Sequence, residues 1–217
     1  LPDVAVIPSE HFNTVIYTGD GNSTHAITGV NFQPDLVWFK RRNEAASHVW
    51  IDAVRGTSKR ISSDQVDAES TASTYLTAFN TDGFTTGNNA HTNENNDTYV
   101  AWNWKANGSG SSNTAGDVTS TVSAKWTAAS STTTETIGHG LGVKPDMMIV
   151  KGLEENGNWN VWHKDLPDGN QSKLHLNLTN AVAADTDVWG NTAPTATLFT
   201  SKSNIYTGNG KDGIGYF

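Results

Sequence analysis

The chain has 217 residues, of which 35% are hydrophobic and only 17% charged, and Thr, Asn, Ser and Gly supply much of the rest. This mix is typical of short strands and turns, and it excludes a helical bundle, which would be richer in Leu, Glu, Lys and Arg. The net charge of −8 argues against a nucleic-acid partner. A membrane partner is not expected either, because no apolar run approaches the roughly 20 residues of a membrane-spanning helix.

The first half of the chain predicts short strands separated by turns rich in Gly, Asn and Asp. The turn at 19–22 carries two glycines, which permit positive φ, and Asp82-Gly83 between two strand-like runs is a strong hairpin signal. Residues 99–104 alternate with the period of two that a half-buried strand shows. The strands predicted in this half cover residues 15–18, 36–40, 49–51, 74–80 and 99–104.

Two polar stretches interrupt this pattern. Residues 64–72 have weak helical character but are short and Ser-rich, which favours a loop. Asp64, Asp67 and Glu69 in this loop could give oxygen ligands to calcium, but they lack the glycine turn and terminal Glu of an EF-hand. A solvated acidic loop is the favoured interpretation, so we expect no metal and no cofactor. Residues 106–116, rich in Gly, Ser and Asn, predict a flexible linker.

The second half repeats features of the first in the same order. Pro34-Asp35-Leu36-Val37-Trp38-Phe39-Lys40 returns as Pro145-Asp146-Met147-Met148-Ile149-Val150-Lys151, and a Val-Trp pair follows each copy. The strands predicted here cover residues 147–151, 160–163, 174–178 and 195–199. An ordered repeat of this length predicts a duplicated β unit. The expected fold is all-β, with two tandem antiparallel β-sandwich or jelly-roll-like units at 1–105 and 117–217, either separate or packed as one pseudo-symmetric domain.

Motifs for catalysis are weak. The sequence has no Gly-x-Ser-x-Gly elbow and no Cys, and its seven His residues show no zinc-binding spacing. A glycosidase needs two facing carboxylates, for which Asp35, Asp52, Asp146 and Asp165 are conceivable members. Asp35 and Asp146 share one repeat position after Pro, which favours a structural turn in both copies. The expectation is therefore a protein that is not an enzyme. His139, set among glycines, is likewise interpreted as part of a turn.

Aromatic residues are the better candidates for ligand contact. Trp50 and Trp162 close the two Val-Trp pairs, and both could stack on sugars, although duplicated core aromatics are the favoured interpretation. Trp189 has no partner in the other copy and lies near a loop, which makes it the preferred ligand platform. His163, directly after Trp162, completes the set of candidate ligand-binding residues.

The absence of Cys bears on where the protein works. Secreted eukaryotic β domains commonly carry disulfides, so a chain without Cys fits a microbial or viral protein that acts outside the cell. The chain opens on Leu1 rather than Met, which suggests processing or a segment of a longer polypeptide. The run Tyr206-Thr207-Gly208-Asn209-Gly210 resembles the signature that opens the first copy, so a further copy could follow.

Taken together, the motifs resemble a domain common in virion proteins of marine bacteriophages. The resemblance covers nearly the whole chain, and the motifs are specific as a set rather than singly. Those that carry it include Tyr17-Thr18-Gly19-Asp20-Gly21, Asp52-Ala53-Val54-Arg55-Gly56, Phe79-Asn80-Thr81-Asp82-Gly83-Phe84, Tyr99-Val100-Ala101-Trp102-Asn103-Trp104-Lys105 and Trp159-Asn160-Val161-Trp162-His163.

This resemblance implies a non-enzymatic structural protein on the virion surface, in a tail fibre or similar appendage. Adhesion to a host glycan is a separate expectation, and it would rest on loops at one end of the sheets, where backbone groups and Asn or Trp side chains can contact sugars. It brings no catalytic residues, and it implies contact with other virion proteins and a homo-oligomer, with a trimer as the family-level expectation. A capsid decoration protein is the first alternative. A glycan-cleaving virion enzyme is the second.

Overall fold

The structure is a computed structural model. It describes residues 7–106, 108–121, 125–129, 133–168, 171–185, 187–202 and 210–217, so most of the run at 206–210 lies outside the described residues. The chain divides into two compact units. Unit 1 comprises Leu1–Ser62 and Ser70–Ser109, and unit 2 comprises Ser63–Glu69 and Gly110–Phe217. Among the described residues, no helix has the length and apolar character needed to cross a membrane.

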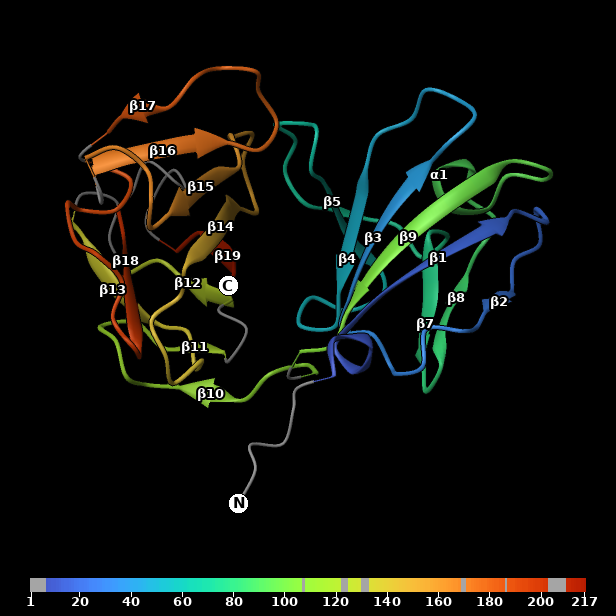
Figure 1. Ribbon diagram of the computed structural model, residues 1–217, viewed down its shortest axis with the longest axis horizontal. Coiled ribbons are helices and arrows are strands. Elements are labelled where there is room, and N and C mark those ends of the chain that lie inside the picture. The colour runs from blue at the N-terminus through green and yellow to red at the C-terminus, as the bar shows by residue number, and fades with distance from the viewer. Residues whose placement is uncertain are drawn as a thin grey trace. The chain divides into compact units, whose positions relative to one another are not determined.

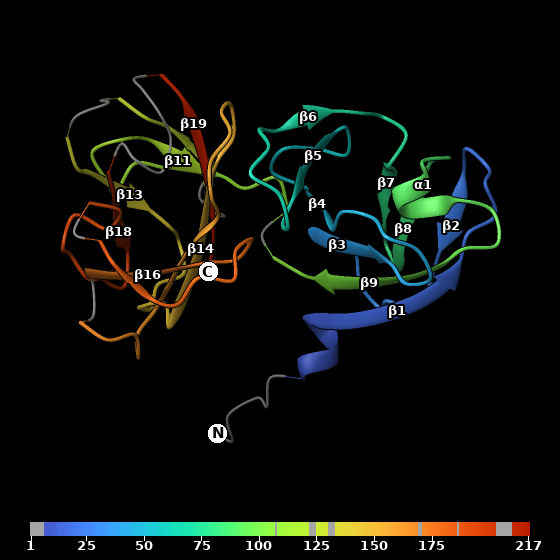
Figure 2. The same ribbon diagram turned by 90° about the horizontal axis from the view of Figure 1, so that it is seen from above.

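Unit 1 consists of two antiparallel sheets (Figure 1). The larger has the order β1-β9-β3-β4-β5-β6 and the smaller the order β2-β8-β7. Figure 2 shows β1, β9 and β3 grouped in one layer. Two short helices accompany them, η1 (Pro8–Glu10) and α1 (Ala90–Asn93). The strands are β1 (Phe12–Thr18), β2 (His25–Ile27), β3 (Leu36–Arg41), β4 (Val49–Asp52), β5 (Lys59–Ser62), β6 (Ser70–Thr71), β7 (Leu76–Asn80), β8 (Gly83–Thr86) and β9 (Thr98–Trp104).

The core of unit 1 lies between these two sheets. Val37 and Phe39 of β3 and Ile51 of β4 face Leu76 of β7 and Phe84 of β8, and all five are fully buried. Phe39 and Phe84 meet edge to face with ring centroids 5.2 Å apart. Burial of both inner faces against each other is what makes the unit a β-sandwich.

The predicted hairpin at Asp82-Gly83 forms between β7 and β8, where Asn80 pairs with Gly83. Gly83 has φ 117°, and a Cβ at this position would lie 2.1 Å from the carbonyl oxygen of Ile27, so only glycine fits. Asp82 in the turn accepts hydrogen bonds from the backbone N–H groups of Asn31 and Gly29 at 2.6 and 3.2 Å, and these bonds hold its pKa below the usual range.

Unit 2 is also built of antiparallel sheets. The larger has the order β10-β11-β12-β19-β14-β15-β16-β17, and β13 pairs with β18 in a second sheet. Their bounds are β10 (Ser112–Asn113), β11 (Ser120–Thr121), β12 (Lys125–Thr127), β13 (Glu135–Gly138), β14 (Met147–Gly152), β15 (Asn160–His163), β16 (Ser172–His175), β17 (Ala183–Ala184), β18 (Leu198–Ser201) and β19 (Asp212–Tyr216). The core between the sheets includes Trp126, Met148, Val150, Trp189 and Phe199.

The structure therefore shows the all-β, antiparallel architecture that the sequence predicts. The two large sheets also share a pairing order, because β9-β3-β4-β5-β6 in unit 1 has the counterpart β19-β14-β15-β16-β17 in unit 2. Descent of both units from one duplicated segment stays a prediction. Of the loop expected at 64–72, residues 64–69 contain no strand or helix, but Ser70–Thr71 form β6, so the loop is shorter than predicted. The turn of α1 was not predicted.

The last residue of the repeated Pro-Asp motif fixes a loop in each unit. Lys40 donates a hydrogen bond to the carbonyl of Ala46 at 2.8 Å. The ammonium of Lys151 is fully buried and binds the carbonyls of Gly152, Val66 and Glu155 at 2.9, 3.3 and 3.4 Å. Burial lowers the pKa of Lys151 to about 8, although the charge of Asp67 opposes the change. The acidic loop that could have bound calcium thus packs within unit 2.

Candidate ligand-binding face

The large sheet of unit 1 carries large apolar side chains on both faces, which is unusual for an antiparallel sheet. Successive strand residues point to opposite faces, so the outer face normally carries polar side chains. In β3 the inner residues are Val37 and Phe39, yet the outer residues include Leu36 and Trp38. An apolar outer face indicates a surface that contacts something other than water.

Five aromatic side chains gather on this outer face: Phe12, Trp38, Trp50, Trp102 and Trp104. We call them the outer aromatic face. Strand pairing explains the cluster, because Trp38 of β3 lies directly opposite Trp50 of β4 on one side and Trp102 of β9 on the other. Phe12 of β1 lies opposite Trp104 of β9 in the same way.

The rings are in mutual contact. The ring of Trp38 lies 5.1 Å from those of Trp50 and Trp102, and Phe12 lies 5.0 Å from Trp104, all measured between centroids. Trp50 and Trp104 are nearly parallel, with an interplanar angle of 8° and centroids 6.3 Å apart. Such contacts restrict ring orientation, so the face is preorganised rather than adaptable.

Exposure is graded across this face. Trp50 is the least exposed of the five, at 3%, and Phe12 is the most exposed, at 40%. Trp38, Trp102 and Trp104 are half-buried. Ile16 follows Phe12 on the same face of β1 and is 64% exposed. The accessible part of the face therefore lies over β1 and β9, whereas Trp50 on β4 is buried.

A buried ion pair lies next to Trp50, the least exposed residue of the outer aromatic face. The Nε of Arg55 donates to the carboxylate of Asp52 at 2.6 Å, and its Nη2 donates to the carbonyl of Trp50 at 3.2 Å. The two side chains are only 1% and 4% exposed. Because Asp52 is opposite Leu36 in the same sheet, this pair fixes the end of β4 and the position of the Trp50 backbone.

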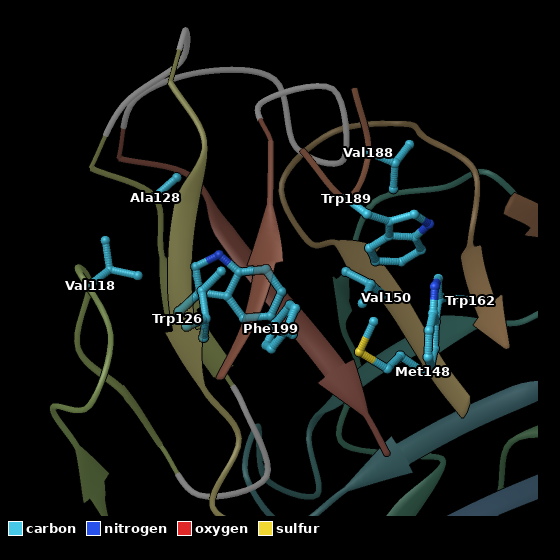
Figure 3. Close-up of a cluster of buried hydrophobic side chains, with 10 residues drawn as sticks. Val118, Trp126, Ala128, Met148, Val150, Trp162, Val188, Trp189 and Phe199 are labelled. Carbon is cyan, nitrogen blue, oxygen red and sulfur yellow. The ribbon is translucent and has the colours of Figure 1, made fainter. Parts of the chain in front are cut away.

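The other predicted ligand residues lie elsewhere. Trp162 and Trp189 are 2% and 1% exposed and belong to the core of unit 2, around Met148 and Val150 (Figure 3). The indole N–H of Trp189 donates to the carbonyl of Ser172 at 3.2 Å, which satisfies it inside the core. Trp189, expected to be a loop platform, is thus a core residue because the chain before β18 folds back over the sheet.

His163 is the remaining candidate. It ends β15, its side chain is 41% exposed, and its Nδ1 accepts a hydrogen bond from the backbone N–H of Asp165 at 3.2 Å. The other three candidates, Trp50, Trp162 and Trp189, are buried, so none of them forms an exposed site together with His163. Of the four candidates, only Trp50 belongs to the outer aromatic face.

The expectation that Trp50 and Trp162 occupy matching positions requires correction. In unit 1 Trp38 pairs with Trp50, and in unit 2 the corresponding Ile149 pairs with Val161, not with Trp162. Counted from each Pro-Asp pair, the second Trp falls one residue later than the first. A shift of one residue moves a side chain to the other face of a sheet, so Trp50 faces outward and Trp162 faces the core.

Sequence reasoning did not assemble Trp38, Trp102, Trp104 and Phe12 into a site. A partial signal was present, because Trp102 and Trp104 stand two residues apart in a strand and so share a face. The pairing of β9 with β1 and β3 joins segments that are far apart in the chain. The local sequence pattern does not predict that β9 pairs with β1 and β3.

Among the described residues, no group of three or more His, Cys, Asp or Glu is placed to hold a metal ion. His139 is 2% exposed and lies in the turn after β13, where Leu141 N–H donates to its Nδ1 at 3.2 Å. Its Nε2 lies 3.2 Å from the carbonyl of Thr195, so the proton of the neutral ring resides on Nε2. Burial lowers the pKa of His139.

Acidification should therefore destabilise unit 2 through His139. Because its pKa in the folded chain lies below the unfolded value of about 6.5, the unfolded state binds the proton first, and stability present above that pH is lost as the pH falls. Urea unfolding at pH 7 and pH 5 should show a smaller loss for His139→Gln, whose amide can replace the Nε2 donor, than for the parent. The exposed His163→Gln is the control, and equal losses in all three proteins would contradict this role.

The fold and this face define an all-β sandwich protein with an aromatic surface on one sheet. The chain belongs to a family described as a domain of unknown function (DUF7483), whose model matches residues 7–217. No curated protein and no solved structure matches the chain.

Proposed function

We propose that the protein is a non-enzymatic structural protein of the bacteriophage virion surface and that its outer aromatic face binds a host glycan. The observation that carries the glycan part is the cluster of Phe12, Trp38, Trp50, Trp102 and Trp104 on one sheet face. Aromatic rings offer flat apolar area at low entropic cost, and the C–H faces of sugar rings pack against them. The resemblance to virion proteins of marine bacteriophages supports the location on a tail fibre or similar appendage.

The partners of the candidate carboxylates support a role without catalysis. Asp35 is buried and accepts the backbone N–H of Ala106 at 2.7 Å, and Asp52 is paired with Arg55. Asp146 binds the ammonium of Lys164 at 3.0 Å, and Asp165 lies 3.7 Å from Nδ1 of His163. Asp35, Asp52 and Asp146 each have a structural partner, whereas a glycosidase needs two carboxylates that face the same substrate bond.

Capsid decoration is the second candidate function. Phe12 and Ile16 on β1 are exposed apolar side chains, which suit contacts with other virion proteins as well as with sugars. A decoration protein would occur in hundreds of copies per particle and a fibre protein in few. Counting the chain in purified virions separates the two.

Glycan binding can be tested with the labelled chain on candidate marine host cells, with and without removal of surface polysaccharide. We expect saturable binding that is lost on removal and weakened about tenfold or more by Trp102→Ala or Trp104→Ala, since one stacked ring contributes on the order of 1 kcal/mol or more. The matched control is Tyr216→Ala, because Tyr216 pairs with Ile149 in unit 2 as Trp102 pairs with Trp38 in unit 1. Folded parent protein that fails to bind, or equal loss in the control, would overturn the adhesion role.

A further inference from the structure

The outer edge of β1 offers a second kind of surface. β1 ends the six-stranded sheet, so one side of its backbone has no partner strand among the residues of unit 1 that the structure describes. Lys105 N–H binds the carbonyl of His11, and Gly19 N–H binds the carbonyl of Asp97, so odd-numbered residues direct their backbone groups toward the β9 side. The even-numbered residues Phe12, Thr14, Ile16 and Thr18 therefore direct theirs to the open edge.

This edge lacks the protection that natural edge strands carry. Exposed edges are usually short, bulged or charged, because unpaired backbone groups attract other strands. β1 has seven residues, pairs with β9 without a break in register and contains no charged residue. The edge strands β6, β10 and β17 have only two residues each, and β7 has a register shift between Leu76 and Ala78.

We propose that β1 pairs antiparallel with β1 of a second copy of the chain, with Thr14 opposite Thr14 of the partner. In this register Phe12, 40% exposed, faces Ile16 of the partner, 64% exposed, and the contact occurs twice about the twofold axis. β1 contains no charged residue, so the paired strands place no like charges directly opposite each other, although each chain carries −8. The N–H of Thr14, now bound to Oδ1 of Asn13 at 2.9 Å, exchanges that local bond for one across the interface.

The pairing joins the two six-stranded sheets edge to edge. Directly opposite residues of an antiparallel pair have side chains on the same face, so the outer aromatic faces of the two copies become continuous. This inference does not depend on glycan binding. It follows from the backbone directions, the exposed side chains and the absence of charge on β1.

The absence of Cys allows a direct test of the register. In the proposed pair the two Thr14 Cα atoms lie about 5.5 Å apart, within the range that a disulfide spans. Under mild oxidation Thr14→Cys should form covalent dimers at least about tenfold faster than Thr18→Cys, because the two copies of Thr18 lie at opposite ends of the paired strands. Both variants carry a single Cys at an exposed position of the same strand.

Sedimentation over a range of concentrations provides the second readout. Ile16→Lys should shift the parent dimer to monomer, while Val143→Lys, at a site in unit 2 that is 65% exposed, should leave it unchanged. Adding Phe12→Glu to Ile16→Lys should restore the dimer, because the register places the new Glu and Lys opposite each other. A chain that stays monomeric, equal cross-linking of the two Cys variants, or an oligomer that Ile16→Lys leaves intact would overturn the proposal.

Discussion

Replacing Arg55 with Met is expected to lower the free energy of unfolding by about 3–5 kcal/mol, because removal of one partner of a buried ion pair leaves the other charge without compensation. The side chains of Arg55 and Asp52 are 1% and 4% exposed, so water cannot replace the lost guanidinium. Arg55 also binds the carbonyl of Trp50, and its loss frees the backbone under the outer aromatic face. Urea unfolding followed by tryptophan fluorescence measures the change.

The matched control is Lys164→Met, which breaks an ion pair with Asp146 whose side chains are 47% and 70% exposed. Exposed pairs contribute about 0–1 kcal/mol, so this variant should unfold nearly as the parent does. If the free energy of unfolding fell by the same small amount in both variants, the Arg55–Asp52 pair would contribute no more to stability than an exposed ion pair. That result would contradict its role in fixing the end of β4.

Trp189→Ala should be comparably severe, with a loss of about 3–5 kcal/mol, since a large buried side chain is removed and the surrounding core closes only in part. Trp189 is 1% exposed and packs in the core of unit 2. Trp189→Phe keeps most of the ring volume but loses the hydrogen bond to Ser172, so a smaller loss of about 1–2 kcal/mol is expected. Thermal and urea unfolding of the three proteins give the comparison.

The same pair of variants separates a core residue from a ligand platform. Folded Trp189→Phe should bind host cells as the parent does, because the proposed ligand face lies on unit 1. If Trp189→Phe had the same free energy of unfolding as the parent but lost cell binding, Trp189 would be a ligand-contacting residue. That result would contradict its place in the core.

The strands were predictable because their signals are local. Alternation, β-branched residues and turn glycines act within a few residues, so β15 occupies the predicted 160–163 and the Asp82-Gly83 hairpin forms where expected. Elements in less regular sequence were shifted, as in β18, which spans Leu198–Ser201 rather than 195–199. In Thr- and Ser-rich sequence the ends of a strand depend on where its partner strand ends, as β13 does for β18, and the local pattern does not predict this pairing.

The candidate site was less accessible from sequence. Whether a Trp faces ligand or core depends on register, and a single residue of offset reverses the answer for Trp50 and Trp162. Trp189 lies in a turn between β17 and β18, and its burial depends on how that turn packs against the sheets of unit 2, which the local sequence does not show. The partners of Trp38 lie on β4 and β9, and Trp102 of β9 is more than sixty residues from Trp38 in the sequence.

The residues of unit 2 that correspond to the outer aromatic face limit how many ligands one chain could hold in this way. In unit 2 the positions that correspond to Trp38, Trp50 and Trp102 carry Ile149, Val161 and Tyr216. The described residues therefore form two sandwiches but one cluster of indoles on an outer sheet face. Under the proposed glycan binding, one chain therefore offers a single ligand face although it contains two sandwiches. Firm attachment to a repetitive cell surface would then come from the number of chains held together, each raising the effective concentration of the next contact.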